Sequence, residues 1–456
     1  MSWVEEEFEA INVGDRRLNN RFFHIVESLG LAPGKTIPQA FKSWGEIKAC
    51  YNFFSNDLVS KQKLLIPHVE KTIERIKHHP VILLPSDTTD LNYTSKETMV
   101  GKERLIRGNT GIWLHTTIAV TPDRLTLGIT DVDFWHRKPK PIDATSRDKA
   151  PIEEKESYRW LQSYLSACEI ARKAPETQVI NITDREGDII ELFETAQEQA
   201  QLGPAAYFIT RARHDRCCED TTKKTQKKLK QRLTEEAPLG EIEFSIPPTE
   251  KRKGRMVKQQ IKAITMTVKA ESIYKKSKKA NVNAIMAIEE NPPEGEKALI
   301  WFFITNLPIN SFNDACNVIK YYLCRWEVEI FINVLKSGCK IEERQLQTTD
   351  RMKALIITFM ILSWRVMYTM MLGRVSAEMS TAEIFEESEW KSVYKIENSK
   401  RPLPKKPPKL GEFIKMVAKL GGYIDRRNGE PPGIKTMWKG MARMVDFAIA
   451  WEAFGR

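Results

Sequence analysis

One stretch of the sequence carries four side chains, spaced as on a helix, that could handle a phosphodiester. It runs from Tyr321 to Lys336 without Gly or Pro, and its composition favours an α-helix. At 100° per residue, Tyr322, Arg325, Glu329 and Lys336 fall along one stripe. A guanidinium and an ammonium can hold a phosphate, a phenol can donate a hydrogen bond to it, and a carboxylate can hold a divalent cation.

The same spacing also fits an ordinary exposed helix. Arg325 and Glu329 are four residues apart, which is a common arrangement for surface ion pairs that stabilise little. Phe331, Val334 and Leu335 lie away from the stripe, so they are expected to pack inward. Spacing alone favours the exposed helix, and the rest of the chain has to decide between the two interpretations.

Two aspartates follow apolar runs that are typical of buried strands. Asp87 comes shortly after residues 81–84, and Asp184 comes directly after residues 178–183. Because proline cannot donate to a central ladder, the first strand is expected to end or bulge at Pro85. Open α/β sheets place their sites at the C-terminal ends of strands, so both aspartates are candidates for one site. Taken alone, Asp87 fits a turn or cap residue better.

Together with Glu329, the two aspartates predict a cluster of three carboxylates. Three converging carboxylates repel one another, so such a cluster is costly without cations. Two Mg²⁺ ions about 3.5–4 Å apart would offset that repulsion and clamp the attacking and leaving oxygens of an in-line displacement. Hard oxygen ligands suit Mg²⁺, or Mn²⁺ in its place, better than zinc.

The patterns around these residues predict a mixed α/β sheet. Strands are expected at 81–84, 112–120, 125–135, 178–183, 207–213 and 299–305, with helices at 152–174, up to 201, at 311–337 and at 351–373. A polar loop is expected at 137–150. Residues 217–291 alternate lysine-rich stretches with β-patterned ones at 242–246, 261–268 and 282–288, which predicts a β insertion with basic loops.

Helical patterns dominate both ends of the chain. Asp15 is a plausible N-cap for a helix on which Arg17 and Arg21 share a face. A second helix is expected at 38–54, with an apolar stripe of Phe41, Trp44, Ile47, Tyr51 and Phe54. These helices suit a DNA-contacting module or an ordinary helical cap equally. Near the other end, a basic linker at 400–409 precedes a helix with apolar residues Trp438, Met441, Met444, Phe447 and Trp451 on one face.

Composition indicates a polyanionic partner and a cytoplasmic protein. The net charge is +11, and residues 211–280 hold 20 Lys and Arg against 9 Asp and Glu, so that region carries the whole excess. Such a concentration favours nucleic acid over membrane. The acidic N-terminus is unlike a signal peptide, and no apolar run approaches the roughly 20 residues of a membrane span. Seven scattered cysteines without C-x-x-C spacing argue against a disulfide framework or a zinc site.

Three segments resemble those of bacterial cut-and-paste transposases of the insertion-sequence-four type, most closely the Tn-five-like group. They are Ser86-Asp87-Thr88-Thr89, Asp184-Arg185-Glu186, and the spacing Tyr322-(2)-Arg325-(3)-Glu329-(6)-Lys336. The last is that family's Tyr-Arg-Glu-Lys signature at its usual spacing. Softer similarities extend from about residue 14 to residue 450.

The resemblance implies an α/β fold with an RNase-H-like, retroviral-integrase-like catalytic core at 71–375, interrupted by the basic β insertion at 217–291. A helical DNA-binding domain at 1–70 would precede the core. A helical C-terminal domain at 376–456 would follow it and pair two subunits in a synaptic complex with double-stranded DNA. Asp87, Asp184 and Glu329 would be the metal-binding catalytic triad, with two Mg²⁺ ions per site.

The family reaction begins when water attacks the phosphodiester at the element's end. The freed 3′-hydroxyl attacks the opposite strand and makes a hairpin, which is reopened before the end joins target DNA. By resemblance, Tyr322, Arg325 and Lys336 would hold the end's phosphates, and a flipped base would stack on Trp301. Trp301 also suits a place in the core. Arg211 would contact a backbone phosphate, and Arg17 and Arg21 would recognise the element's end.

Two other functions fit the same residues. A metal-dependent DNA nuclease or resolvase could use the same core. A transposase relic could bind DNA without catalysis and act as a regulator. The four-residue signature, Trp301 and the basic insertion favour a protein that holds an end through several steps. The presence of all three carboxylates and Lys336 disfavours the relic.

Overall fold

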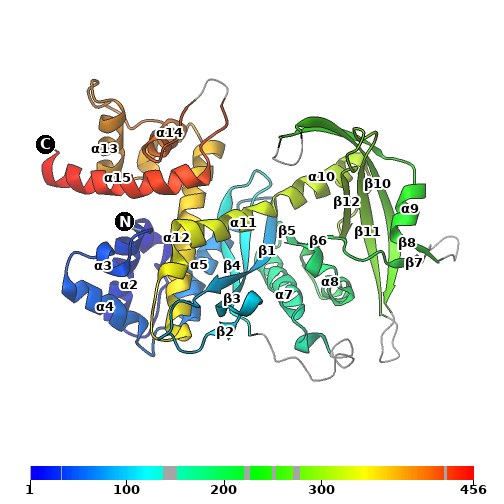
Figure 1. The fold of residues 1–456 in the computed structure, drawn as a ribbon, viewed down its shortest axis with the longest axis horizontal. Helices are drawn as coiled ribbons and strands as arrows, with labels where there is room; N and C mark the ends of the chain where they lie inside the picture. Colours follow the sequence, from blue (N-terminus) through cyan, green and yellow to red (C-terminus); the bar gives the residue numbers. More distant parts are fainter. Residues whose placement is uncertain are drawn as a thin grey trace. The chain divides into compact units, whose positions relative to one another are not determined.

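The structure, a computed structural model, describes residues 2–31, 33–136, 151–219, 226–248, 253–270, 278–425 and 429–455. Packing divides the chain into two compact units. Unit 1 comprises Met1–Ile76, Thr88–Arg137 and Glu327–Arg456, and unit 2 comprises Lys77–Asp87 and Lys138–Trp326. The predicted loop at 137–150 and parts of the lysine-rich stretches lie outside the described residues. The predicted mixed α/β class with helical termini is confirmed (Figure 1).

Unit 2 contains a mixed sheet that begins with three parallel strands. The parallel strands are β1 (Val81–Asn92), whose first half belongs to this unit, β5 (Gln178–Thr183) and β6 (Tyr207–Arg211). The sheet continues from β6 through antiparallel neighbours. In sheet order these are β12 (Ile300–Thr305), β11 (Lys278–Glu289), β10 (Arg255–Ala270), β7 (Cys217–Glu219) and β8 (Gln226–Lys228), with β9 (Gly240–Ile246) also on β10.

The sequence predicted that the first strand ends or bulges at Pro85. In the structure, β1 does not end there. It runs on to Asn92, and Pro85 pairs in register with Ile182 of β5. Proline removes a single donor, and its fixed φ is compatible with extended backbone, so neighbouring residues can maintain the ladder. Asp87 therefore lies inside a strand. Asp184 follows the end of β5, as expected.

The two faces of the unit 2 sheet are covered by different helices. Leu83, Ile182, Ile209 and Phe303 share a buried cluster with the apolar side of α10 (Phe312–Leu323). The opposite face meets α7 (Tyr158–Lys173) and α8 (Ile190–Gln201), where Phe208 stacks on Phe193 at 5.2 Å between ring centroids. Figure 1 shows α7 and α8 together beside β5 and β6. Because side chains alternate along a strand, this assigns every sheet residue to one face.

Unit 1 is built around one long helix, α12 (Thr349–Val375). By length and composition it could cross a membrane, although the sequence appeared to lack such a run; 89% of its most apolar window is buried inside the fold. Together with α5 (Lys61–Ile76) it packs on β4 (Thr126–Asp133), which pairs with β3 (Thr110–Val120), and β3 also pairs with β2 (Glu103–Arg104). The helices α13 (Glu387–Glu397), α14 (Leu410–Leu420) and α15 (Ile434–Phe454) pack on one another (Figure 1).

Two expected helices are each divided in the structure. The helix expected at 38–54 is α3 (Ile37–Ala40) followed by α4 (Trp44–Phe54), because Ser43 forms a capping box that starts a new helix. Trp44, expected in the apolar stripe, is 76% exposed. The helix expected at 311–337 is α10, then α11 (Trp326–Asn333), then a π-helical turn at Val334–Gly338.

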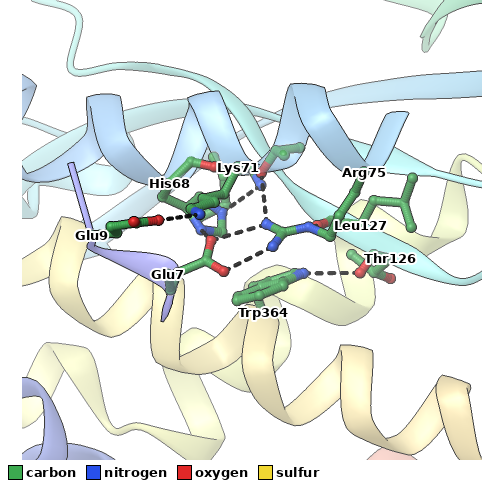
Figure 2. A network of polar contacts seen from close by, with 10 residues as sticks. Glu7, Glu9, His68, Lys71, Arg75, Thr126, Leu127 and Trp364 are labelled. Atoms are coloured by element: carbon green, nitrogen blue, oxygen red, sulfur yellow. Dashed lines mark hydrogen bonds and ion pairs between the residues drawn. The ribbon is translucent and has the colours of Figure 1, made fainter. Parts of the chain in front are cut away.

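A buried polar network joins the N-terminal helix α1 (Trp3–Glu7) to α5 and β4 (Figure 2). The Glu7 carboxylate accepts from both terminal nitrogens of Arg75, at 2.8 and 2.9 Å, and lies 2.5 Å from Nδ1 of His68. The backbone N–H of Ile129 donates to Nε2 of His68 at 2.9 Å. Because Nε2 accepts, the His68 proton must lie on Nδ1 and point to Glu7. The Arg75 guanidinium also covers the Trp364 ring at 4.5 Å.

Candidate functional site

The register of two parallel strands places Asp87 and Asp184 side by side in unit 2. The last paired residues of β1 and β5 are Pro85 and Ile182, and each aspartate lies two residues further along its own chain. Two residues is one side-chain period of a strand, so both aspartates keep the face of Pro85 and Ile182. The sequence predicted this pairing from strand ends. The structure produces it with one aspartate inside a strand and the other just after one.

The same face of the sheet collects two further predicted residues. Arg211 lies two residues after Ile209, and Trp301 lies two residues before Phe303, so both have the parity of the face covered by α10. Asp87, Asp184, Arg211 and Trp301 therefore share one face of one unit. A count of odd and even positions along the four strands would have found this from sequence.

Tyr322 and Arg325 reach this face from the end of α10. The helix ends at Leu323, and the N–H groups of Cys324 and Arg325 bond back to Tyr321 and Tyr322 in a tight turn. The turn puts Arg325 outside both helices, with Nη1 3.7 Å from Oδ2 of Asp87. The four signature residues therefore do not lie on one continuous helix stripe, which corrects the sequence interpretation. Arg325 meets Asp87 because of the helix break.

The electrostatics of this group are dominated by burial. Burial raises the pKa of Asp184, and the backbone N–H of Glu186 and the charge of Arg325 oppose that shift only in part. Burial also raises the pKa of the Tyr322 phenol, with Arg325 and Arg211 opposing. Tyr322 is therefore a protonated donor at neutral pH.

Arg211 and Trp301 differ in what surrounds them. Burial, together with the like charges of Arg185 and Arg325, lowers the pKa of Arg211. Arg211 is therefore close enough to these two arginines to feel their charge. Trp301 is half-buried and stacks on Phe244 of the insertion strand β9, at 5.7 Å between ring centroids and 20° between planes. The sequence left Trp301 open between the core and a base contact. In this structure its ring has a packing partner.

Glu329 and Lys336 belong to unit 1. Glu329 is half-buried on α11, whose Phe331 is fully buried, and Val334 and Leu335 of the next turn are fully buried as predicted. Lys336 lies in the π-helical turn, with Nζ 3.8 Å from a carboxylate oxygen of Asp90 and 3.8 Å from one of Glu342. π-turns are frequent at functional sites, and this one sets the direction of Lys336.

Three acidic residues within five positions have three different environments. Asp184 caps a short 3₁₀ turn, accepting from the N–H of Glu186 at 2.7 Å. Glu186 itself pairs with Arg159 of α7. Asp188 is fully buried and accepts from Arg216 and from the backbone N–H of Arg213. The sequence analysis missed Arg159. The signal that could have found it is a cation next to Trp160 on the buried side of α7, because a buried cation needs an acidic partner.

The oxygen donors of Asp87 and Asp184 fit a divalent cation. Each aspartate lies two residues past the last paired residues of neighbouring strands, burial raises the pKa of Asp184, and the charges of Arg325 and Arg159 oppose that shift only in part. A hard dication would supply the missing charge. Among the described residues, no group of three or more His, Cys, Asp or Glu side chains is already gathered around a common point.

Arg17 and Arg21 line a groove in the N-terminal part of unit 1. The helix α2 (Arg16–Leu31) begins after Asp15, whose carboxylate accepts from the N–H of Arg17 at 2.7 Å, as the predicted cap requires. Both arginines are exposed, and the groove has a volume of about 640 Å³. Its other wall comes from the start of α4, where Glu46 lies 3.5 Å from His24.

Comparison with known proteins finds transposase segments at both ends of the chain. Residues 1–59 match the transposase DNA-binding family, and residues 361–453 match the transposase Tn5 dimerisation domain. These matches support a DNA transposase that binds DNA and dimerises. The arginine-lined groove lies within the first match, and α13, α14 and α15 lie within the second.

A solved structure also shows a distant similarity. It is the cryo-EM synaptic complex of the piggyBac transposase with hairpin DNA, of which one chain is 8% identical to this one with a TM-score of 0.38. The alignment covers 94% of this chain and 82% of that chain. A similarity this low carries no argument about fold or activity.

Proposed function

We propose that this chain, a DNA transposase by the matches at its two ends, moves its own element by cut-and-paste. It would cut the element's terminal inverted repeats in a Mg²⁺-dependent hydrolysis, form hairpin ends, and join the 3′-hydroxyl ends to target DNA. This is the chemistry of the Tn5-like, insertion-sequence-four type that the Tyr-Arg-Glu-Lys spacing resembles. The core would be RNase-H-like, and the protein would act as a homodimer in the bacterial cytoplasm.

One observation carries this proposal: Asp87 in β1 and Asp184 just after β5 each lie two residues past the last paired residues of these neighbouring parallel strands, with Arg325 3.7 Å from Asp87. Paired carboxylates beside an arginine suit a phosphodiester, because the carboxylates can hold metal cations and the guanidinium can hold the phosphate. Glu329 would be the third carboxylate. It follows Arg325 by four residues, and α11 carries it.

Asp87, Asp184 and Glu329 would hold the divalent cations. When bound, Mg²⁺ or Mn²⁺ supplies Lewis-acid stabilisation of the charge that develops on phosphate oxygens. The chain's own contribution is positional. Arg325 is ion-paired with Asp87 in this structure, so neutralisation of Asp87 by a cation would release the guanidinium to a phosphate. Tyr322 would donate its phenolic proton in a hydrogen bond to the same phosphate.

The remaining cations would hold the strand on either side. Arg211 shares the sheet face of the aspartates, so it would contact a backbone phosphate there. Lys336 is held between two carboxylates in unit 1 at 3.8 Å each, distances long enough for a phosphate to compete. Arg17 and Arg21 would recognise the element's end in the N-terminal groove.

The test uses DNA that flanks the protein's own gene, incubated with Mg²⁺ and either wild type or Glu329→Gln. Wild type is expected to give hairpins and joined junctions. Glu329→Gln is expected to bind that DNA with unchanged affinity and give no cuts. Sequenced cuts without hairpins or joining would identify a nuclease or resolvase, and binding without cuts by wild type would identify a relic. Equal loss of binding and cutting in Glu329→Gln would remove Glu329 from the metal site.

Trp301→Ala separates two roles for this ring. If a flipped base stacks on Trp301, the first nick should form at a near-normal rate, while hairpin formation should fall about 5- to 150-fold, given ~1–3 kcal/mol per stacked base. Phe244→Ala is the control, because it removes the partner that stacks on Trp301 in the protein. Normal hairpins from Trp301→Ala would assign the ring to packing alone. Gel analysis of nicked and hairpin products measures both steps.

A further inference from the structure

A cavity in unit 1 contains none of the predicted site residues. It has a volume of about 290 Å³ and is lined by α1, α2, α12, α15 and the segment that leads into α13. We call it the arginine–glutamate cavity, after Arg365 of α12 and Glu389 of α13, which both line it. Its volume lies at the lower end of the range for small-molecule sites. The cavity therefore suits a small ligand.

Most of the wall of this cavity is apolar and firmly packed. Leu362, Phe385 and Met444 line it and are buried. A Cβ on Gly30 of α2 would approach Leu362 to 3.1 Å, so α2 and α12 are in close contact at this wall. Met441 and Met444 come from α15, and methionine side chains adapt to the shape of what they contact. A ligand of this cavity should carry an apolar group.

Two opposite charges line the same cavity without forming an ion pair. The Arg365 guanidinium donates to the Ile384 carbonyl at 3.1 Å and lies 5.3 Å from the centre of the Trp3 ring. The Glu389 carboxylate accepts from the backbone N–H of Glu386 at 2.9 Å. Within the described ranges of the chain, no carboxylate lies at ion-pair distance from Arg365, and no cation lies at that distance from Glu389. A molecule between them could contact both.

Burial makes these two separated charges costly. It lowers the pKa of Arg365, with Tyr368 and Glu389 opposing, and it raises the pKa of Glu389, with the Glu386 N–H and Arg365 opposing. Glu27 and Glu386 line the cavity as well, so a purely anionic ligand would meet three carboxylates and one cation. The charges of the cavity are best matched by a ligand that carries both signs.

We propose that the arginine–glutamate cavity binds a small zwitterion, a free α-amino acid with an apolar side chain. The ligand's carboxylate would accept from the planar fork of N–H donors of Arg365. Its ammonium would donate to Glu389, and its side chain would lie against the methionines of α15. The inference goes beyond the proposed function and does not rest on it, because it involves neither DNA nor the carboxylate cluster.

The test titrates the full chain with three probes that share one branched apolar group, and calorimetry measures their affinities. The probes are L-leucine, isoamylamine, which lacks the carboxylate, and isocaproate, which lacks the ammonium. L-leucine is expected to bind saturably, once per chain, and to raise the unfolding midpoint as its concentration increases. Each of the other two should bind at least about tenfold more weakly, because it leaves one buried charge without a partner.

Three variants assign the two ligand charges to their residues. Glu389→Gln keeps an oxygen for the Glu386 N–H, so it should weaken L-leucine at least about tenfold and leave isocaproate unaffected. Arg365→Lys loses the planar fork, so it should weaken L-leucine and isocaproate but not isoamylamine. Glu383→Gln is the matched control, since it removes a carboxylate from an exposed position outside the cavity, and it should bind all three probes as wild type does.

Four results would overturn the inference. They are no saturable binding of L-leucine to wild type, isoamylamine binding as tightly as L-leucine, wild-type affinity for L-leucine in both site variants, and an equal loss of affinity in Glu383→Gln. The second would identify a site for simple cations. If a site variant does not fold, the comparison of the three probes on wild type still decides. Because no DNA is present, failure of the proposed function would leave all of these measurements unchanged.

Discussion

Asp184→Asn is expected to slow strand cleavage at least about 10³-fold, equivalent to ~4 kcal/mol of lost transition-state stabilisation, while DNA affinity and thermal stability stay close to wild type. Asn keeps the oxygen that accepts from the Glu186 N–H, and it is as good a capping residue as Asp. What it removes is the negative charge beside Asp87. The measurement is a single-turnover cleavage assay at saturating Mg²⁺, with thermal unfolding of the same preparations.

The neighbouring acids provide matched controls for that result. Glu186→Gln removes a charge two residues away that faces Arg159, so cleavage should remain within about tenfold of wild type. Asp188→Asn should instead act on stability, because Asp188 is buried and accepts from Arg216 and backbone N–H groups. If Glu186→Gln proved as inactive as Asp184→Asn, the assignment of the metal ligand to Asp184 would be wrong.

The sequence could predict much of this site because its signals are local. The apolar run at 178–183 corresponds to β5, and Asp184 follows it in both sequence and structure. The alternation of side chains along a strand is equally local. Counted along β6 and β12, that alternation is enough to place Arg211 and Trp301 on the sheet face of the aspartates.

What the sequence could not predict depends on contacts made across the fold. No local sequence signal marks the helix break after Leu323, because the two residues of the turn are Cys324 and Arg325 and neither is Gly or Pro. At the break, Cys324 is buried in the core beneath α10, and Arg325 lies near Asp87. Pro85 is the reverse case. Its local preference predicted a strand end, but pairing with β5 carries the strand through it. Tertiary contacts decided both outcomes.

The largest effect on stability is expected from Glu7→Ala. The Glu7 carboxylate is buried between Arg75 and His68, so its removal leaves a partly buried guanidinium and an imidazole N–H without their acceptor (Figure 2). Breaking one side of a buried ion pair costs about 3–5 kcal/mol, which corresponds to a fall of roughly 6–12 °C in the unfolding midpoint of a unit this size. Glu9→Ala is the control, since Glu9 is exposed and its ion pair is with Lys71, itself on the surface of α5. A similar midpoint in both variants would contradict the role assigned to the network.

The same network makes the stability of unit 1 depend on pH in two separate ranges. Burial alone would raise the pKa of Glu7, but hydrogen bonds and charge from His68 and Arg75 lower it from 4.5 to about 2. The unfolded state therefore binds more protons than the folded state between those values, and the stability contributed by Glu7 is lost as the pH falls from about 4.5 toward 2.

Burial lowers the pKa of His68, with Glu7 opposing, so unfolding also takes up a proton when the pH is below 6.5. The free energy of unfolding should then fall between pH 7 and pH 5 as well as below pH 4.5. His68→Gln should flatten the first range and keep the second, because Glu7 retains Arg75. Urea unfolding followed across these pH values distinguishes the two groups, and a wild-type curve that is flat from pH 7 to pH 5 would show that folding does not lower the pKa of His68.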